Sequence, residues 1–220
     1  MERYGSTNPR RSAAVAGGLF LVALVFAIIV GNDPSPFAVD VAWADRAAAI
    51  RSDALTSVAN VFGALGRFQL SWLIVAVAGS ILWRQRRTQA IAVLLIGEAV
   101  SWATNSLIKA AVDRPRPPGA IVEASRSSFP SGHAAFAAVT AVLLVGLLVP
   151  AGRRVGPAFL AAALALVMGL SRIYLGVHWL TDVIAGLCVG AGIGLLTLAF
   201  AGSAADRRDV ASPDPASSTT

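Results

Sequence analysis

The sequence contains several apolar stretches, each long enough to cross a lipid bilayer as one helix. A hydrocarbon core about 30 Å thick needs roughly 20 apolar residues, because a helix rises about 1.5 Å per residue. Backbone groups inside a bilayer must be hydrogen-bonded internally, which a helix achieves within one segment. We therefore predict an all-α, polytopic membrane protein with six transmembrane helices in a bundle, near residues 13–31, 62–83, 89–112, 131–150, 155–174 and 179–200.

Composition agrees with this interpretation and argues against other classes of protein. Hydrophobic residues make up 56% of the 220 residues and charged residues only 14%, too few to cover a water-soluble globule of this size. The formal net charge of +6 would suit nucleic acid, but the arginines form short clusters between apolar stretches, so we expect no nucleic-acid partner. The single cysteine, Cys188, can form neither a disulfide framework nor a cysteine metal cluster.

The arginine clusters predict the orientation of the bundle. If six spans alternate, all the clusters fall on one side, which the positive-inside rule makes cytoplasmic: Arg10–Arg11, Arg84 with Arg86–Arg87, Arg153–Arg154 and Arg207–Arg208. Both termini are then cytoplasmic in a multi-pass protein of the cell membrane. The opposite, extracytoplasmic side receives segments 32–61, 113–130 and 175–178.

We expect the first span to be retained rather than cleaved as part of a signal peptide. Ala42-Trp43-Ala44 resembles a cleavage site, but the apolar core of residues 13–30 exceeds the roughly 7 to 15 residues of a signal peptide. Residues 201–220 are rich in Ser, Ala, Asp and Pro, which predicts a disordered tail. The expected organisation is an N-terminus (1–12), a six-span domain (13–200) and this tail.

The segment 32–61 lies outside the membrane, between the first two expected spans. It opens with Asp33-Pro34-Ser35-Pro36 and continues with apolar residues at helical intervals. This pattern indicates an amphipathic helix on the membrane surface. Packing against the bundle is a simpler role for this helix than a lid or a lipid entrance.

A lysine stands near the outer end of the third expected span. Six residues separate Lys109 from Arg116-Pro117, in a proline-rich sequence that ends the helix. Burying a lysine in an apolar span costs free energy. Considered by itself, Lys109 is best explained by a side chain that extends to the membrane interface. Anion binding is the alternative interpretation.

Ser131-Gly132-His133 leads directly into the fourth expected span. Ser131 and Gly132 thus fall near a helix N-terminus, where free backbone N–H groups and the helix dipole favour an anion. Without His133, an ordinary N-cap serine followed by a flexible glycine would be a better explanation of this sequence than an anion site.

Arg172 closes the fifth expected span, and His178 follows six positions later. Asp182 lies four residues beyond His178, and positions four apart share one face of a helix. Asp182 can therefore accept a hydrogen bond from one imidazole nitrogen and leave the other basic, as the carboxylate of a catalytic triad does. An interface histidine beside a capping aspartate is the structural alternative.

The common location of these three segments makes a binding site the better interpretation. The chain has only two histidines, and both lie on the same expected face as Lys109, Arg116 and Arg172. Cations and imidazoles gathered at one membrane surface are costly to keep unless an anion binds among them. A phosphate group meets that requirement.

Together these segments resemble the three-part signature of the type 2 phosphatidic acid phosphatase (PAP2) family, in its bacterial membrane lipid phosphatase branch. The resemblance covers about residues 60–200, and the signature itself covers 109–182. The family includes undecaprenyl pyrophosphate and phosphatidylglycerophosphate phosphatases, and shares its site with vanadium haloperoxidases and glucose-6-phosphatase. It implies hydrolysis of a lipid phosphomonoester or pyrophosphate in the membrane, such as undecaprenyl diphosphate, phosphatidylglycerophosphate or phosphatidic acid.

The resemblance also implies a role for each residue. His178 would attack phosphorus and become a phosphohistidine, with Asp182 orienting its ring. His133 would protonate the departing lipid oxygen and then activate water. The substrate phosphate would be bound by Lys109, Arg116, Ser131, Gly132 and Arg172.

We expect neither a cofactor nor a metal ion, because the expected outer face has no cluster of carboxylate or Cys/His ligands. Two further arginines of the outer loop, Arg114 and Arg126, lie outside the signature. Either could widen the anion-binding surface, but a solvated loop charge is the better interpretation. Glu98 and Asn105 share one face of the third span with Lys109. We expect Glu98 to pair structurally inside the bundle rather than to act in catalysis.

A non-catalytic lipid-binding or transport protein on the same fold is the alternative function, because a fold alone does not establish an activity. The presence of His133, His178 and Asp182 argues against it. A haloperoxidase is disfavoured because those relatives are chiefly soluble. The sequence leaves open the lipid substrate, the choice between monophosphate and diphosphate, and the oligomeric state.

Overall fold

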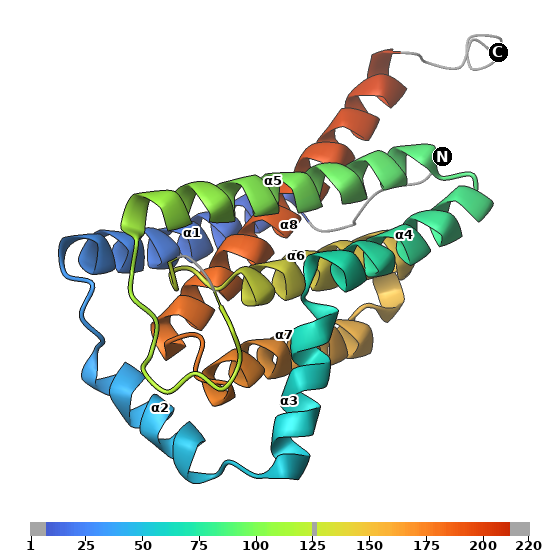
Figure 1. The fold of residues 1–220 in the computed structure, drawn as a ribbon. Helices are drawn as coiled ribbons and strands as arrows, with labels where there is room; N and C mark the ends of the chain where they lie inside the picture. Colours follow the sequence, from blue (N-terminus) through green and yellow to red (C-terminus); the bar gives the residue numbers. More distant parts are fainter. Residues whose placement is uncertain (1–7, 125–126, 212–220) are drawn as a thin grey trace, which may run out of the picture.

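The computed structural model describes residues 8–124 and 127–211, in which every regular element is a helix (Figure 1). Four of these helices are long and apolar enough to cross a membrane. They are α1 (Pro9–Asn32), α5 (Thr88–Val112), α7 (Val155–Tyr174) and α8 (Leu180–Ala211), the last over its apolar stretch to Ala204. The prediction of an all-α membrane protein is confirmed.

The second expected span, 62–83, is not one straight helix. Its residues belong to α3 (Asp53–Leu65) and α4 (Phe68–Arg84), which meet at a bend of 60°. Gly66 ends α3, and Arg67 has an extended backbone as the N-cap of α4. If the bent pair counts as one span, five candidate spans result. The expectation of one continuous helix was wrong. The segments on both sides of Gly66 have an apolar composition, so composition does not reveal that the helix axis changes direction there.

The fourth expected span, 131–150, corresponds to α6 (Gly132–Leu148), which is apolar but only 17 residues long. At about 1.5 Å per residue this helix is about 26 Å long, slightly less than a typical hydrocarbon core. Its end is set by the sequence, because Pro150 forces Val149 into an extended conformation. A short 3-10 helix, η1 (Ala151–Arg153), then leads into α7.

The segment between the first two expected spans forms two helices instead of one. α2 (Ala38–Ala49) is followed by a break, and Ser52 then starts α3 as its N-cap, with its hydroxyl accepting from the Leu55 amide at 3.4 Å. Asp53 in the first turn of α3 complements the positive end of the helix dipole. This new N-terminus explains why the amphipathic pattern does not produce a single helix.

Helices α6 and α8 form the centre of the bundle and make the most extensive contact in it. Glycines one turn apart on α8 allow this, because an added Cβ at Gly186 or Gly190 would meet the carbonyl oxygen of Ser131 or Ala135. Small residues at such spacing are typical of close helix packing in membranes. Since Ser131 directly precedes α6, the same packing fixes the N-terminus of α6 against α8.

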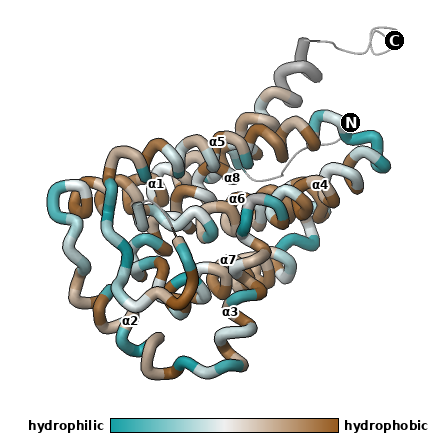
Figure 2. Tube along the Cα trace, viewed as in Figure 1, coloured by the Kyte–Doolittle hydropathy of each residue, from teal (hydrophilic) through white to brown (hydrophobic). Residues whose placement is uncertain are grey.

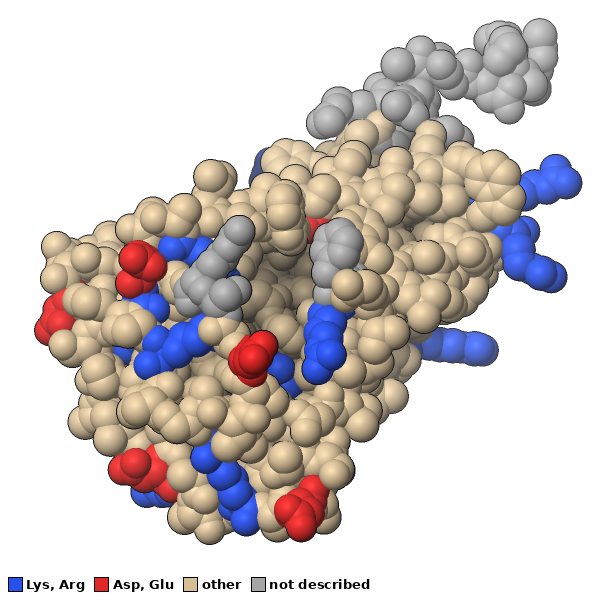
Figure 3. Space-filling view, viewed as in Figure 1, with Lys and Arg blue, Asp and Glu red and all other residues tan. Residues whose placement is uncertain are grey.

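Polar segments collect at the ends of the bundle, and hydrophobic residues dominate the long helices between them (Figure 2). The α1–α2, α5–α6 and α7–α8 connections lie at one end, together with α2 and α3, and the α4–α5 turn lies at the other (Figure 1). Lys and Arg side chains are visible at both ends, with a largely uncharged surface between them (Figure 3). This distribution is what a bilayer around the middle of the molecule requires.

The expected disordered tail differs from the structure in its first part. Helix α8 continues to Ala211, ten residues beyond the expected start of disorder at 201. The remaining tail, 212–220, lies outside the described residues.

Candidate active site

Helix ends and two loops bring the sequence-predicted site residues to the same end of the bundle. Lys109 lies in the last turn of α5, Ser131 is the N-cap of α6, and Arg172 lies in the last turn of α7. Arg116 lies in the α5–α6 loop and His178 in the α7–α8 loop, and Asp182 lies in the first turn of α8.

The His178 ring lies between a carboxylate and a guanidinium. Its Nδ1 is 3.5 Å from Asp182 Oδ2, long for a hydrogen bond, and its Nε2 is 3.4 Å from Arg116 Nη1. A guanidinium can only donate, so this contact requires an electron pair on Nε2 and places the ring proton on Nδ1, facing Asp182. His178 thus presents a basic Nε2 beside a cation.

Burial keeps the His178 ring neutral. The residue is 4% exposed, and desolvation lowers its pKa to about 4, although the neighbouring Asp182 carboxylate acts in the opposite direction. Lys109 and Arg116 lower this pKa further by charge repulsion. A neutral imidazole at neutral pH is the form that can attack phosphorus.

The second oxygen of Asp182 is held by Arg114, whose predicted role was wrong. Arg114 is 1% exposed, and its Nη1 donates to Asp182 Oδ1 at 2.6 Å. Its Nη2 forms a second ion pair, at 2.8 Å, with Asp40 of α2. The solvated charge expected from the sequence is therefore a buried centre of two ion pairs. Arg126, interpreted in the same way, lies outside the described residues.

A threonine completes this network. The Thr181 hydroxyl accepts from Arg114 Nη1 and donates to Asp40 Oδ2, both at 2.8 Å, and the Thr181 amide donates to Asp40 Oδ1 at 2.9 Å. Asp40 is fully buried and thereby ties α2 to the start of α8. This contact gives the segment 32–61 a packing role at the site. Sequence reasoning missed Asp40 and Thr181, and the only available signal was an aspartate among apolar residues in α2.

The other three cations are oriented by backbone carbonyls. Lys109 Nζ donates to Ser127 O at 2.8 Å, and Arg116 Nη2 approaches the same oxygen at 3.4 Å. Arg172 Nη2 donates to Ala59 O at 3.0 Å. In the part of the chain that the structure describes, Lys109 and Arg172 form no ion pair with a carboxylate. These cations can therefore take anionic oxygens as partners.

The N-terminus of α6 lies against the same residues. The Ser131 amide donates to Asp182 O at 2.9 Å, and the Ser131 hydroxyl accepts from the Ala134 amide at 3.5 Å. Ser131 thus caps α6 in the ordinary way and connects it to the carboxylate-bearing turn of α8. The first amides of α6, beginning with Gly132, lack intrahelical acceptors and suit an anion.

His133 faces the end of α3, which sequence reasoning did not include in the site. Its Nε2 is 3.2 Å from Gly63 O, an oxygen that can only accept, so Nε2 carries the proton and Nδ1 is the basic nitrogen. A Cβ at Gly66 would meet the His133 ring, and one at Gly63 would meet the Arg172 guanidinium. The two glycines let α3 pack directly on these side chains.

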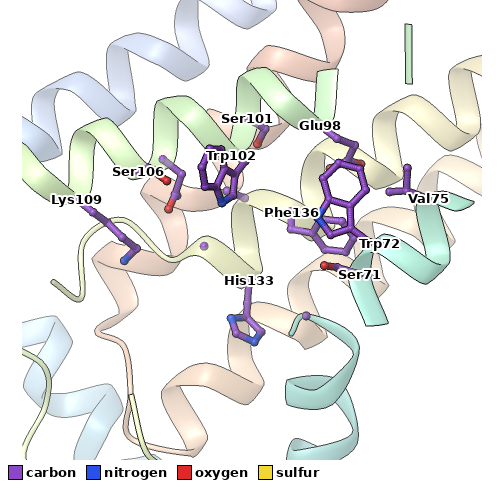
Figure 4. A pocket seen from close by; sticks show the side chains of 14 residues that line it. Ser71, Trp72, Val75, Glu98, Ser101, Trp102, Ser106, Lys109, His133 and Phe136 are labelled. Atoms are coloured by element: carbon purple, nitrogen blue, oxygen red, sulfur yellow. The ribbon is translucent and has the colours of Figure 1, made fainter. Parts of the chain in front are cut away.

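A cavity of about 290 Å³ begins at this site and extends between α4, α5 and α6. Lys109 and His133 lie at one end of it, and Glu98, Trp72 and Val75 lie deeper in the bundle (Figure 4). The site therefore opens into a pocket between the helices of the bundle. Among the described residues, no three His, Cys, Asp or Glu side chains cluster as metal ligands would.

Comparison with known protein families identifies the superfamily to which this chain belongs. The model of the PAP2 superfamily matches residues 88–205, more than half of the chain. The chain belongs to the PAP2 superfamily. All eight predicted site residues, which lie between positions 109 and 182, fall within the matched range.

Curated relatives of this PAP2 protein are named as phosphatases. Phosphatidylglycerophosphatase B of Bacillus subtilis is 30% identical over 188 residues, covering 83% of this chain and 92% of the relative. Decaprenylphosphoryl-5-phosphoribose phosphatase of Mycobacterium tuberculosis is 34% identical over 156 residues, covering 69% and 83%. These relatives support a lipid phosphate hydrolase rather than a haloperoxidase.

Solved structures agree with the PAP2 fold. A transmembrane PAP2-type phosphatidylglycerolphosphate phosphatase from Bacillus subtilis superposes with a TM-score of 0.73 at 28% identity, covering 88% of this chain and 96% of that one. LpxE from Aquifex aeolicus superposes with a TM-score of 0.60 at 23% identity, covering 74% and 96%, and supports the fold alone.

Proposed function

We propose that this protein hydrolyses the phosphate ester or pyrophosphate of a membrane lipid, with His178 as the nucleophile. The observation that carries the proposal is the His178 ring, neutral and buried, with Nδ1 toward Asp182 and Nε2 beside Arg116. A nucleophile needs a basic nitrogen directed at phosphorus and a group that stabilises the charge formed on attack. Asp182 stabilises the imidazolium character that develops as Nε2 bonds to phosphorus.

In the first step His178 Nε2 forms a bond to phosphorus while the bond from phosphorus to the lipid oxygen breaks. His133 enters this step as the imidazolium, with a second proton on Nδ1, and donates that proton to the departing oxygen. In the second step His133 removes a proton from water, the water oxygen bonds to phosphorus, and the bond to Nε2 breaks. Inorganic phosphate leaves, and both histidines return to their initial state.

Positive side chains stabilise the phosphoryl oxygens during both steps. Lys109, Arg116 and Arg172 supply charge, and Ser131 and Gly132 supply donors at the N-terminus of α6. Lysine and arginine donate hydrogen bonds and do not ligate metal ions, so this set replaces a metal rather than holding one. The chemistry needs no cofactor.

The proposed arrangement in the cell follows from the charge pattern of the sequence. Six spans within residues 13–200 form the phosphatase domain, α3–α4 and α6 contributing two of them, and both termini are cytoplasmic. The site then faces the extracytoplasmic side of the cell membrane. Polyprenyl diphosphates, phosphatidylglycerophosphate and phosphatidic acid are the candidate substrates, and the named relatives favour a monophosphate carried on a glycerol or a sugar.

Phosphate release by the detergent-solubilised protein tests the proposal. Catalytic efficiency should be measured for phosphatidylglycerophosphate, phosphatidic acid and undecaprenyl diphosphate, with the His178→Ala variant as a matched control. We expect release from at least one lipid by the unmodified protein and none above background by the variant. Absence of release from every lipid would favour a lipid-binding or transport protein on the same fold.

A further inference from the structure

The cavity that begins at the phosphate site has a polar lining far into the bundle. Glu98, Ser101 and Asn105 line the cavity from one face of α5, spaced three and four residues apart, and Lys109 continues the same face. Figure 4 shows Glu98, Ser101 and Lys109 in this order along the helix. Glu98 is 5% exposed, Ser101 3% and Asn105 7%. Buried polar side chains in a membrane span are costly unless they are hydrogen-bonded, so this stripe indicates a polar ligand.

One member of the stripe already has a partner within the protein. Thr140 of α6 donates to Glu98 Oε1 at 2.6 Å, at the deep end of the cavity. This hydrogen bond gives one Glu98 carboxyl oxygen a partner and agrees with the structural role expected from the sequence. It leaves the donor groups nearer to the phosphate site as the candidates for ligand binding.

Asn105 is the donor nearest to the phosphate site. In the described part of the chain, no acceptor lies within hydrogen-bonding distance of its buried Nδ2 atom. Its Oδ1 atom lies against Gly132, where an added Cβ would be 3.4 Å away. Asn105 also lies one turn from Lys109, about 6 Å along the axis of α5. Asn105 lines the same cavity as His133, the proposed proton donor to the leaving group, so a group bound to Asn105 would belong to the leaving group.

A pure hydrocarbon leaving group does not fit this position, because it would leave the Asn105 amide buried and unpaired. A hydroxyl or carbonyl oxygen close to the phosphate ester would accept from Nδ2. The hydrocarbon part of such a lipid has an exit, because Trp72 of α4 and Trp102 of α5 line the cavity and are 38% and 66% exposed on the outside of the bundle.

We propose that the cavity between α4, α5 and α6 is a leaving-group subsite in which Asn105 donates to an oxygen next to the phosphate ester. This inference rests on the proposed function and makes it more specific. The preferred substrate has its phosphate on a polyol, such as a glycerol or a sugar, rather than directly on a polyprenyl chain. Asn105 recognises that polyol.

A matched pair of lipids tests the subsite in the full-length protein. An alkylglycerol phosphate has a free hydroxyl beside the phosphate ester, and the corresponding alkyl propanediol phosphate lacks only that hydroxyl. We expect the unmodified protein to prefer the alkylglycerol phosphate by about five- to tenfold in kcat/KM, the effect of one hydrogen bond to a buried donor. In Asn105→Leu, which keeps a branched side chain and removes the donor, this ratio should fall to about one.

Controls separate the subsite from its alternatives. Thr104→Val changes a neighbouring residue of α5 that does not line the cavity, and it should keep the ratio of the unmodified protein. Asn105→Ala provides a second variant if the leucine does not fold. Equal efficiency of the unmodified protein on both lipids would overturn the subsite, as would equal losses on both lipids in the Asn105 variants. Release from neither lipid, by a protein that hydrolyses one of the three lipids of the first assay, would also overturn the subsite, whereas release from no lipid in either assay would overturn the proposed function.

Discussion

Arg114 Nη1 lies 2.6 Å from Asp182 Oδ1, and neither side chain is exposed to solvent. The other oxygen of Asp182 faces His178, so one carboxylate connects a structural cation to the proposed nucleophile. Arg114 also pairs with Asp40, which makes it the link between α2 and the active site. Arg114 is therefore a positioning residue that acts through Asp182.

Removing the Arg114 charge should damage both the fold and the activity. Arg114→Met leaves two buried carboxylates without their cation, which costs about 3 to 5 kcal/mol in the free energy of unfolding. It also frees the Asp182 side chain to rotate away from His178. We expect a lower unfolding temperature in detergent and a loss of kcat larger than any change in KM.

Arg86→Met is the matched control, because Arg86 is exposed at the opposite end of the bundle. Its unfolding temperature and kcat should equal those of the unmodified protein. Normal stability of the Arg114→Met variant would contradict the buried network. In the double variant Arg114→Met with Asp40→Asn, one unpaired charge is removed, and part of the lost stability should return.

The two histidines should differ in the step that each affects. His178→Ala removes the nucleophile, so labelled phosphate from the substrate should no longer be trapped on the protein. His133→Ala should slow phosphate release by about 100- to 10,000-fold, with the smallest loss for acidic leaving groups that need no proton. Quench-flow trapping and a series of aryl phosphates measure the two effects. Labelled protein in the His178→Ala variant would refute the assignment.

The titration of His178 should occur far below that of an ordinary histidine. Burial lowers its pKa to about 4 from 6.5 in the unfolded chain. Between these pH values the unfolded state binds more protons, so the free energy of unfolding decreases as the pH falls from 6.5 towards 4. Histidine-labelled protein carrying His133→Gln retains a single imidazole. An NMR midpoint near or above 6.5 would contradict the buried neutral ring.

Catalysis should survive chelation, because Lys109, Arg116 and Arg172 supply the charge that metal ions supply in other phosphatases. We expect unchanged kcat/KM in excess EDTA after extended dialysis. The control is inhibition by inorganic phosphate, the product of the reaction, which should compete with substrate whether or not EDTA is present. Complete loss of turnover on chelation, restored by Mg²⁺ or Zn²⁺, would be inconsistent with a site built from cations.

The close packing of α8 on α6 predicts an unusually sensitive glycine. In Gly190→Ala the new methyl group would meet the Ala135 carbonyl oxygen, so the helices must separate and the unfolding temperature should fall. Gly18→Ala is the control, because a Cβ at Gly18 of α1 meets nothing within 4 Å. Replacing a helical glycine in open space by alanine should raise the free energy of unfolding by about 0.5 to 1 kcal/mol. Equal behaviour of the two variants would contradict the close contact.

Local patterns in the sequence predicted many of the helices of this structure. Residues 89–112 and 155–174 were predicted as spans and form α5 and α7 almost to the residue, because apolar length directly reports on membrane-spanning helices. Ser131 was weighed as an N-cap and is one. The bend at Gly66 was not predicted, because the hydropathy of a segment does not report the direction of the helix axis.

The sequence by itself determined a helical membrane protein, and it predicted the residues of a phosphate site, because apolar length and the spacing of charged residues are local properties. The tertiary structure alone decided what Arg114, Asp40 and Asn105 contact. Arg114 and Asp40 are 74 positions apart in the chain, and their charges meet only when α2 packs beside the α5–α6 loop and the start of α8. A charge in a loop sequence is solvated or buried according to what folds over it, and that depends on contacts between distant segments.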